Sequence, residues 1–171
     1  MIVFNRRSRL PVWANQVTSA GLLSRFSYAF KQPEGSAYPP ILQLNHIEGP
    51  VKIDGAGGQI EFTPFEVAHG QITALGFRIG PVAYLPDVSA MPPAAWEALA
   101  GIDCWILDAL RRDPHPSHSH LAQSIEWIDQ SNVARAVLTN MHNDLDYATL
   151  QVELPKHILP AFDGMVLSYD L

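Results

Sequence analysis

The chain has 171 residues, of which 47% are hydrophobic and 16% charged, and its formal net charge at pH 7 is −6. This length suits one domain with a hydrophobic core, and this composition excludes a disordered chain. No run of Lys or Arg is longer than a pair, which together with the acidic balance argues against binding of long nucleic acids. No apolar stretch approaches the roughly 20 residues of a membrane span, so we expect a cytoplasmic protein with no membrane partner.

The first half of the chain predicts a strand, a helix and a strand, followed by an antiparallel meander. Residues 10–14 have the pattern of a strand, and residues 18–30 carry Leu and Phe at helical spacing. Residues 41–47 alternate as a strand does. Four strand-like pieces then follow, separated by glycines, at residues 51–53, 59–67, 71–79 and 82–85.

The second half predicts strands that alternate with helices. Residues 104–107 and 133–138 are short apolar runs typical of strands buried on both faces. Residues 93–100 and 119–129 have helical patterns, and Ser117 or Ser119 could cap the second of these helices. We therefore predict a layered α/β fold that forms a single domain over residues 1–171.

Histidines are the most prominent candidates for chemistry, since the chain has seven of them and a single cysteine. Cys104 lies in an apolar run, and we expect it to be buried. His69 ends a predicted strand, and Asp87 follows another, at the kind of position where α/β sites gather. Neither a Gly-x-Ser-x-Gly motif nor a Walker lysine is present, so metal-assisted hydrolysis is favoured over a serine nucleophile.

Two polar segments follow the apolar strands of the second half. Residues 113–120 contain three histidines, and residues 138–146 contain six polar or charged side chains among nine. If the second segment is extended, Asn140 and His142 lie on one side of it. An ordinary loop histidine or turn aspartate would have the same sequence pattern, so these positions alone leave a structural role open.

Five segments, taken in order, resemble one protein family. They are EVAHG at residues 66–70, GFRIG at 76–80, VAYLPD at 82–87, DALR at 108–111 with HPSH at 115–118, and LTNMH at 138–142. The family is the metallo-β-lactamase superfamily branch that contains phosphoribosyl cyclic phosphate phosphodiesterases. The closing residues 162–165 also resemble the last strand of that branch.

The resemblance implies an αββα sandwich in which two divalent ions, zinc or manganese, activate a water for attack on a small, cyclic phosphodiester. It implies that His69 and Asp87 are metal ligands and that His118 is the catalytic acid. The last ligand position falls on Asn140 or His142, and we expect His142 to be the ligand. The implied substrate-contacting residues are His115, His120 and Asn140.

One departure from the family pattern is large. The His-x-His-x-Asp-His motif, which supplies most ligands of one ion, is absent from the chain. The resemblance then implies an N-terminally truncated fold, of which this chain is the C-terminal two-thirds. We expect weak or no metal binding and impaired activity of the chain alone. Open sheet edges should lead to a homo-oligomer or to contact with an N-terminal partner segment.

Two alternatives to a phosphodiesterase stay open. The chain could be a non-catalytic remnant that binds a phosphate or a nucleotide in the same cleft. It could also be a relative of the nucleases that share the fold, although its acidic balance weighs against long RNA substrates.

Overall fold

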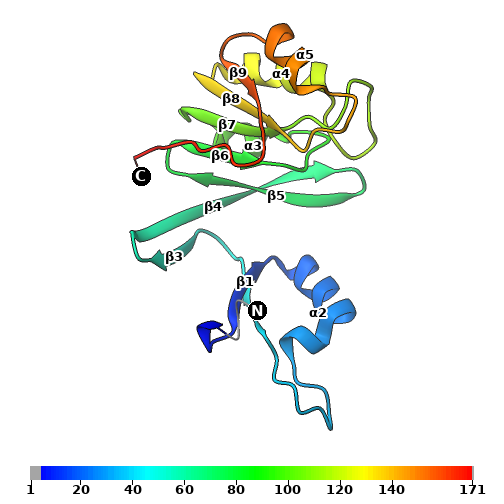
Figure 1. The fold of residues 1–171 in the computed structure, drawn as a ribbon, viewed down its shortest axis with the longest axis vertical. Helices are drawn as coiled ribbons and strands as arrows, with labels where there is room; N and C mark the ends of the chain where they lie inside the picture. The colour runs from blue at the N-terminus through cyan, green and yellow to red at the C-terminus, as the bar shows by residue number, and fades with distance from the viewer. Residues whose placement is uncertain (1–4, 171) are drawn as a thin grey trace. The chain divides into compact units, whose positions relative to one another are not determined.

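The structure is a computed structural model that describes residues 5–170 (Figure 1). The chain divides into two units, residues 1–50 and residues 51–171, each with its own dense internal contacts. The sequence-based expectation of a single domain stays a prediction. Within the described range, no helix combines the length and the apolar character that crossing a membrane requires.

The first unit contains strand β1 (Leu10–Ala14), helix α2 (Gln16–Phe30) and strand β2 (Leu42–His46). The two strands pair in parallel, which requires a crossover connection, and α2 provides it. The helix begins after Asn15, because the side-chain oxygen of Asn15 accepts a hydrogen bond from the Thr18 N–H at 2.9 Å. The strand–helix–strand order predicted for this region is confirmed.

The second unit is built on a seven-stranded sheet in the order β3-β4-β5-β6-β7-β8-β9. The first four strands pair antiparallel, as the glycine-separated meander predicted, and the last four pair in parallel. The strands are β3 (Val51–Gly55), β4 (Gly58–His69), β5 (Ile72–Ile79), β6 (Val82–Leu85), β7 (Cys104–Asp108), β8 (Arg135–Thr139) and β9 (Ile158–Pro160).

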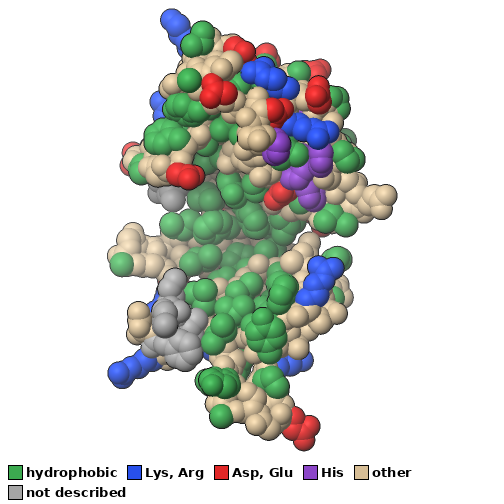
Figure 2. All heavy atoms as spheres, turned by 45° about the vertical axis from the view of Figure 1, so that its right-hand side comes forward, with side chains coloured by type: hydrophobic (Ala, Val, Ile, Leu, Met, Phe, Trp, Pro, Cys, Tyr) green, Lys and Arg blue, Asp and Glu red, His purple; other side chains and the backbone are tan. Residues whose placement is uncertain are grey.

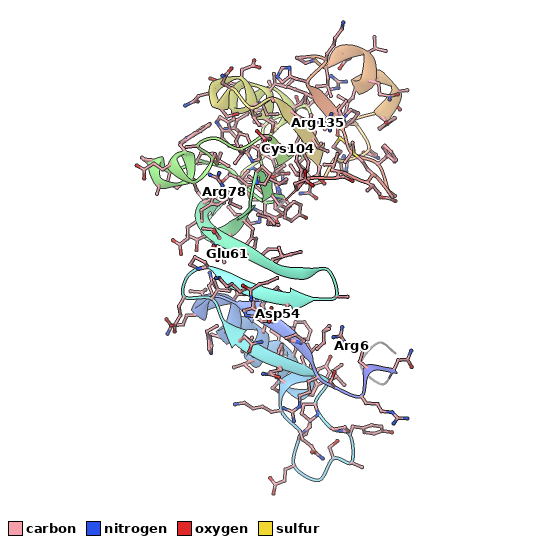
Figure 3. The ribbon with its side chains drawn as sticks, turned by 90° about the vertical axis from the view of Figure 1, so that its left-hand side faces the viewer. Arg6, Asp54, Glu61, Arg78, Cys104 and Arg135 are labelled. Atoms are coloured by element: carbon pink, nitrogen blue, oxygen red, sulfur yellow. The ribbon has the colours of Figure 1, made fainter. Side chains whose placement is uncertain are left out.

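Three helices connect the parallel strands of this sheet: α3 (Pro93–Ala98), α4 (Leu121–Ser131) and α5 (Tyr147–Glu153). Arg78 on β5, labelled in Figure 3, joins the meander to α3. Its Nη1 donates hydrogen bonds to the carbonyls of Ala98 at 3.1 Å and Ala100 at 2.8 Å. These carbonyls lie at the end of α3, where the last backbone acceptors of a helix lack partners of their own.

Two local expectations were wrong. Residues 162–165 are not the last strand, because they form a turn in which the Met165 N–H donates to the Phe162 carbonyl at 3.0 Å, while β9 lies a few residues earlier. Neither Ser117 nor Ser119 caps α4, because His120 occupies the N-cap position without a side-chain cap bond. The hydroxyl of Ser119 instead donates to the Asp108 carbonyl at 2.8 Å.

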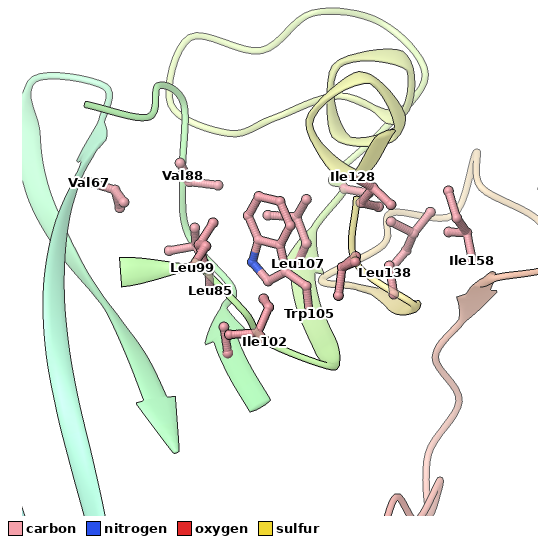
Figure 4. Close-up of a cluster of buried hydrophobic side chains, with 14 of the residues drawn as sticks. Val67, Leu85, Val88, Leu99, Ile102, Trp105, Leu107, Ile128, Leu138 and Ile158 are labelled. Atoms are coloured by element: carbon pink, nitrogen blue, oxygen red, sulfur yellow. The ribbon is translucent and has the colours of Figure 1, made fainter. Parts of the chain in front are cut away.

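The core of the second unit lies between the parallel strands and the helices (Figure 4). Strands β7 and β8 are buried along most of their length, as their apolar runs predicted, and Cys104 is fully buried. Trp105 is also fully buried, and its Nε1 is the buried side-chain atom for which the described residues offer no hydrogen-bond partner. The ring of Trp96 on α3 meets it edge to face at a centroid distance of 6.1 Å. Packing in this core fixes the positions of β7 and β8, and so of the residues at the ends of these strands.

Candidate functional site

Polar side chains gather where the strands of the second unit end. His69 is the last residue of β4, and Asp108 is the last residue of β7. Asn140 directly follows β8, and Asp87 lies just beyond Pro86, which follows β6. Strands β6, β7 and β8 are parallel, and β4 runs in the same direction because β4 and β6 are both antiparallel to β5. All four side chains therefore come to the carboxyl-end edge of one sheet, where α/β proteins place their sites.

Three side chains at this edge form a compact group. Candidate metal-ligand atoms of His69, Asp87 and His118 lie within 4.8 Å of one another. The rings of the two histidines meet edge to face at a centroid distance of 4.6 Å, and the Nδ1 of His118 is 4.0 Å from an Asp87 oxygen. Figure 2 shows histidine side chains together at the surface, with acidic and basic side chains beside them.

His69 is held in one tautomer by the backbone. Its Nδ1 lies 2.6 Å from the carbonyl oxygen of Ser117. A carbonyl can only accept a hydrogen bond, so Nδ1 carries the proton and the lone pair is on Nε2. A neutral imidazole fixed in this way is ready to bind a metal ion through Nε2.

His118 is held by a buried carboxylate, Asp108, whose side chain has no exposure to solvent. One Asp108 oxygen lies 2.8 Å from the His118 Nδ1 and accepts from the Val88 N–H at 3.2 Å, and the other accepts from the Asn140 amide at 3.2 Å. Burial raises the pKa of Asp108, while the hydrogen bonds from His118 and Val88 oppose that shift. With Nδ1 engaged, the free nitrogen of His118 is Nε2.

Asp108 was not recognised as a site residue from the sequence, although it lies in one of the segments that resemble the family. The available signal was a carboxylate that ends an otherwise apolar strand. A charge at such a position is expensive to bury unless it is hydrogen-bonded, and here its partners are site residues.

Two of the other predicted residues, His115 and Asn140, lie beside His118, and a third, His120, is placed by the structure at the start of a helix. The His115 ring lies 5.3 Å from the His118 ring by centroids, and its Nδ1 accepts from the Ser117 N–H at 3.3 Å. Desolvation, and next the positive charge of Arg111, lower the pKa of His115. Asn140 adopts a left-handed backbone, with φ at 61°, and its amide nitrogen is 3.3 Å from the His118 Nδ1. His120 serves as the N-cap residue of α4.

His142 lies apart from the group of three. Its side chain is 61% exposed, and its Nδ1 lies 3.3 Å from an Asp144 oxygen. Of the two residues considered for the last ligand position, Asn140 is therefore the one at the strand-end site in this structure. The ligand role of His142 stays a prediction.

The group suits one divalent ion. Two imidazole nitrogens and one carboxylate oxygen are ligand types that zinc accepts. Tetrahedral zinc, with bonds of about 2.0–2.1 Å, needs ligand atoms about 3.3 Å apart. The observed spacing of up to 4.8 Å is close enough for small side-chain rotations to reach it. Across residues 5–170 no second group of three such residues was found.

Known proteins match this chain at the level of sequence. A family model described as a beta-lactamase superfamily domain matches residues 2–141. A protein of Porphyromonas gingivalis described as an octanoyltransferase is 30% identical over 161 residues, covering 91% of this chain and 32% of that protein. This chain therefore spans about a third of that relative's length.

Solved structures match at the level of the fold. A structure described as a new diphosphatase from the PhnP family is 31% identical with a TM-score of 0.83, covering 96% of this chain and 60% of the other. Zinc-bound PqqB from Methylobacterium extorquens is 14% identical, with a TM-score of 0.69. The match covers 95% of this chain and 66% of the PqqB chain. The short form of human tRNase Z is 15% identical, with a TM-score of 0.62. The match covers 96% of this chain and 68% of the tRNase Z chain. The last two similarities concern the fold alone.

These matches confirm the α/β fold class and the superfamily that the sequence motifs indicated. The matched range includes the segments that carry His69, Asp87, His118 and Asn140. The chain belongs to the beta-lactamase superfamily.

Proposed function

We propose that this chain forms the metal centre of a hydrolase that cleaves a small phosphodiester, with a cyclic phosphodiester as the preferred kind. The observation that supports the proposal most directly is the meeting of His69, Asp87 and His118 at one sheet edge. The PhnP-family neighbour adds support, because it is described as a diphosphatase and so also acts at phosphorus–oxygen bonds.

In this proposal the ion is zinc or manganese, and His69 and Asp87 hold it. A bound ion would supply Lewis-acid activation of water and of a phosphoryl oxygen. The Nε2 of His69 is available because the Ser117 carbonyl occupies the Nδ1–H. The Asp87 side chain is 48% exposed, so its carboxylate can reach an ion without first breaking a buried contact.

His118 is the proposed general acid. Its Nδ1–H is held by Asp108, which leaves Nε2 to carry the proton that passes to the leaving oxygen. The same Nε2 cannot bind an ion and deliver a proton at once, so the acid role excludes the ligand role. His115, His120 and Asn140 are the proposed contacts to substrate around it.

His142 is proposed as a further ligand only after a local rearrangement. The imidazole would have to leave Asp144 and turn toward the strand-end site, which its 61% exposure leaves free of packing constraints. Asn140 already lies at that edge, where its amide bridges Asp108 and the Pro86 carbonyl. Removing each residue in turn would show which of the two a bound ion uses.

The test of the proposal is hydrolysis of bis-p-nitrophenyl phosphate by the purified chain with added Zn²⁺ or Mn²⁺. We expect slow turnover above the metal-only background, lost on chelation. Asp87→Asn should abolish it, whereas Asp144→Asn, which alters an exposed carboxylate beside His142, should leave it intact. Turnover that survives Asp87→Asn would contradict the proposal.

A second candidate function is binding of a phosphate or nucleotide without catalysis. It is favoured because residues 5–170 hold one group of candidate metal ligands, whereas two-metal hydrolysis needs two such groups. Calorimetry with inorganic phosphate and with AMP distinguishes the two functions. Binding that depends on His118 but comes with no turnover at any metal concentration would favour the binding module.

A further inference from the structure

The turn after His69 is made of Gly70 and Gln71. His69 pairs with Ile72 across the β4–β5 hairpin, so these two residues are the whole connection. Gly70 has a φ of 62°, in the left-handed region that favours glycine. A two-residue hairpin turn of this kind commonly needs a positive φ, and this explains the glycine at position 70. It does not explain why another segment packs closely against the turn.

Gly70 is also a point of close approach between two segments distant in sequence. A Cβ at Gly70 would lie 3.0 Å from the Cβ of Ser117, and 3.5 Å from the Ser117 Cα and the Pro116 carbonyl oxygen. The first distance is tighter than nine in ten real Cβ contacts, so the neighbour would have to shift by a few tenths of an ångström, and the other two are ordinary contacts. Pro116 and Ser117 therefore approach the turn this closely because Gly70 has no side chain.

The turn is fixed from its other side. The Gly70 N–H donates to the Ser89 hydroxyl at 2.9 Å, and the Ser89 N–H donates to the Ala68 carbonyl at 2.8 Å. A new Cβ at Gly70 would thus move the Ser117 segment rather than the turn. That segment carries the carbonyl that holds His69 and is followed directly by His118.

We propose that Gly70 is a positioning residue for the metal centre: its missing side chain lets Ser117 approach, and this contact sets the tautomer of His69 and its distance from His118. The inference rests on the proposed function in treating His69 as a metal ligand. The contact itself requires neither an ion nor a substrate, so it can be tested without them.

The chain offers a matched control in Gly101, which lies between α3 and β7. Its φ is 70°, so an alanine there meets the same left-handed backbone penalty as at Gly70. A Cβ at Gly101 would have no atom within 4 Å. Gly70→Ala and Gly101→Ala therefore share the backbone cost and differ in the contact with Ser117.

The experiment compares the wild type, Gly70→Ala, Gly101→Ala and the double variant Gly70→Ala/Ser117→Gly. Long-range ¹H–¹⁵N NMR of the metal-free protein at about pH 8.5, well above the ordinary histidine pKa of about 6.5, reports the His69 tautomer. We expect the Nδ1–H form in the wild type and in Gly101→Ala, and its loss in Gly70→Ala. The affinity for Zn²⁺ should fall about 10-fold or more in Gly70→Ala only.

The double variant tests the contact directly, because Ser117→Gly removes the atom that a Cβ at position 70 would meet. It should restore the tautomer, or restore folding if Gly70→Ala does not fold. An unchanged tautomer in Gly70→Ala, equal losses in Gly101→Ala, or no restoration in the double variant would each overturn the inference. A wild type with the Nδ1–H tautomer but no hydrolysis would instead contradict the proposed function alone.

Discussion

The two histidines of the site are oriented by different kinds of partner. A backbone carbonyl holds the Nδ1 of His69, and a buried carboxylate holds the Nδ1 of His118. A carbonyl fixes a tautomer without adding charge, which suits a neutral metal ligand. A carboxylate stabilises a protonated imidazole, which suits an acid. The contrast supports different roles for two rings that are 4.6 Å apart.

The role of His118 can be tested by His118→Gln. If His118 is the acid, this change should lower turnover about 10²- to 10⁴-fold, because general acid catalysis contributes that much. The affinity for Zn²⁺ should stay within about 3-fold, since the ligands are untouched. Steady-state kinetics and calorimetry measure the two quantities. His157→Gln, at a histidine that lies beside Asp129, is the control. Loss of Zn²⁺ binding in His118→Gln would make His118 a ligand instead.

Asp108→Asn tests the negative charge beside His118. The Asp108 oxygen that meets the His118 Nδ1 also accepts from the Val88 N–H, so the asparagine oxygen should keep that position and the Nδ1–H tautomer. The charge that stabilises a protonated imidazole is lost. We expect turnover to fall at least about 10-fold while Zn²⁺ affinity changes little. Histidine ¹⁵N spectra of the folded variant check that the tautomer is retained. Wild-type turnover in Asp108→Asn would rule out this role for Asp108.

At the level of single residues, the sequence predicted the histidines and Asp87 but not the groups that orient them. Asp108 lies at the end of an apolar strand, and nothing in the sequence says that a histidine ten residues later folds back onto it. Ser117 contributes its carbonyl, which every residue has, so its identity carries no signal. The position of His142 against Asp144 was likewise invisible, because loop backbone decides it.

At the level of elements, the site depends on the ends of strands and on the short helices that join them. Helix α5 is capped at its N-terminus by Asp146, whose side chain accepts from the Thr149 N–H at 2.8 Å and from the Thr149 hydroxyl at 2.7 Å. These bonds lower the pKa of Asp146 below its ordinary value of 3.8. The cap thus stabilises the segment that follows the polar loop 140–146.

The cap predicts a dependence of stability on acidity. Because the folded-state pKa of Asp146 is the lower one, its contribution is complete above the ordinary value of 3.8 and is lost as the pH falls through the folded-state pKa. Asp146→Asn keeps a capping oxygen that does not titrate. Urea unfolding of both proteins from neutral pH to below pH 3.8 should show the wild type losing more stability than the variant. Parallel losses would contradict this.

Element lengths explain which parts of the fold were predictable. The meander and the apolar strands β7 and β8 have long or strongly apolar patterns, and both were predicted. Helix α5 has seven residues and β9 has three, too few for a periodic pattern to stand out. The family resemblance alone placed the last strand on residues 162–165, which the structure shows as a turn.

At the level of the whole molecule, the seven-stranded sheet has two outer strands, β3 and β9. Outer strands present unpaired backbone groups, and natural proteins usually cover or charge them. Strand β3 carries Ile53, which is 36% exposed. The chain spans 60% of the PhnP-family diphosphatase that it matches.

We expect the isolated chain to self-associate through such an edge. Ile53→Lys should reduce the association, because a lysine on an edge strand opposes pairing. Val152→Lys, on an α5 residue that is 86% exposed, is the matched control and should have no effect. Light scattering over a range of concentrations measures the association. A monomer at all concentrations would rule it out.

The central claim is that His69 and Asp87 form a metal centre at the strand ends, and the most direct measurement is calorimetric titration with Zn²⁺. The wild type should bind one ion weakly but saturably through His69 and Asp87. His69→Ala and Asp87→Ala should each abolish that binding, whereas Asp144→Ala should leave it unchanged. Binding that persists in both His69→Ala and Asp87→Ala, or no binding by the wild type, would contradict the account.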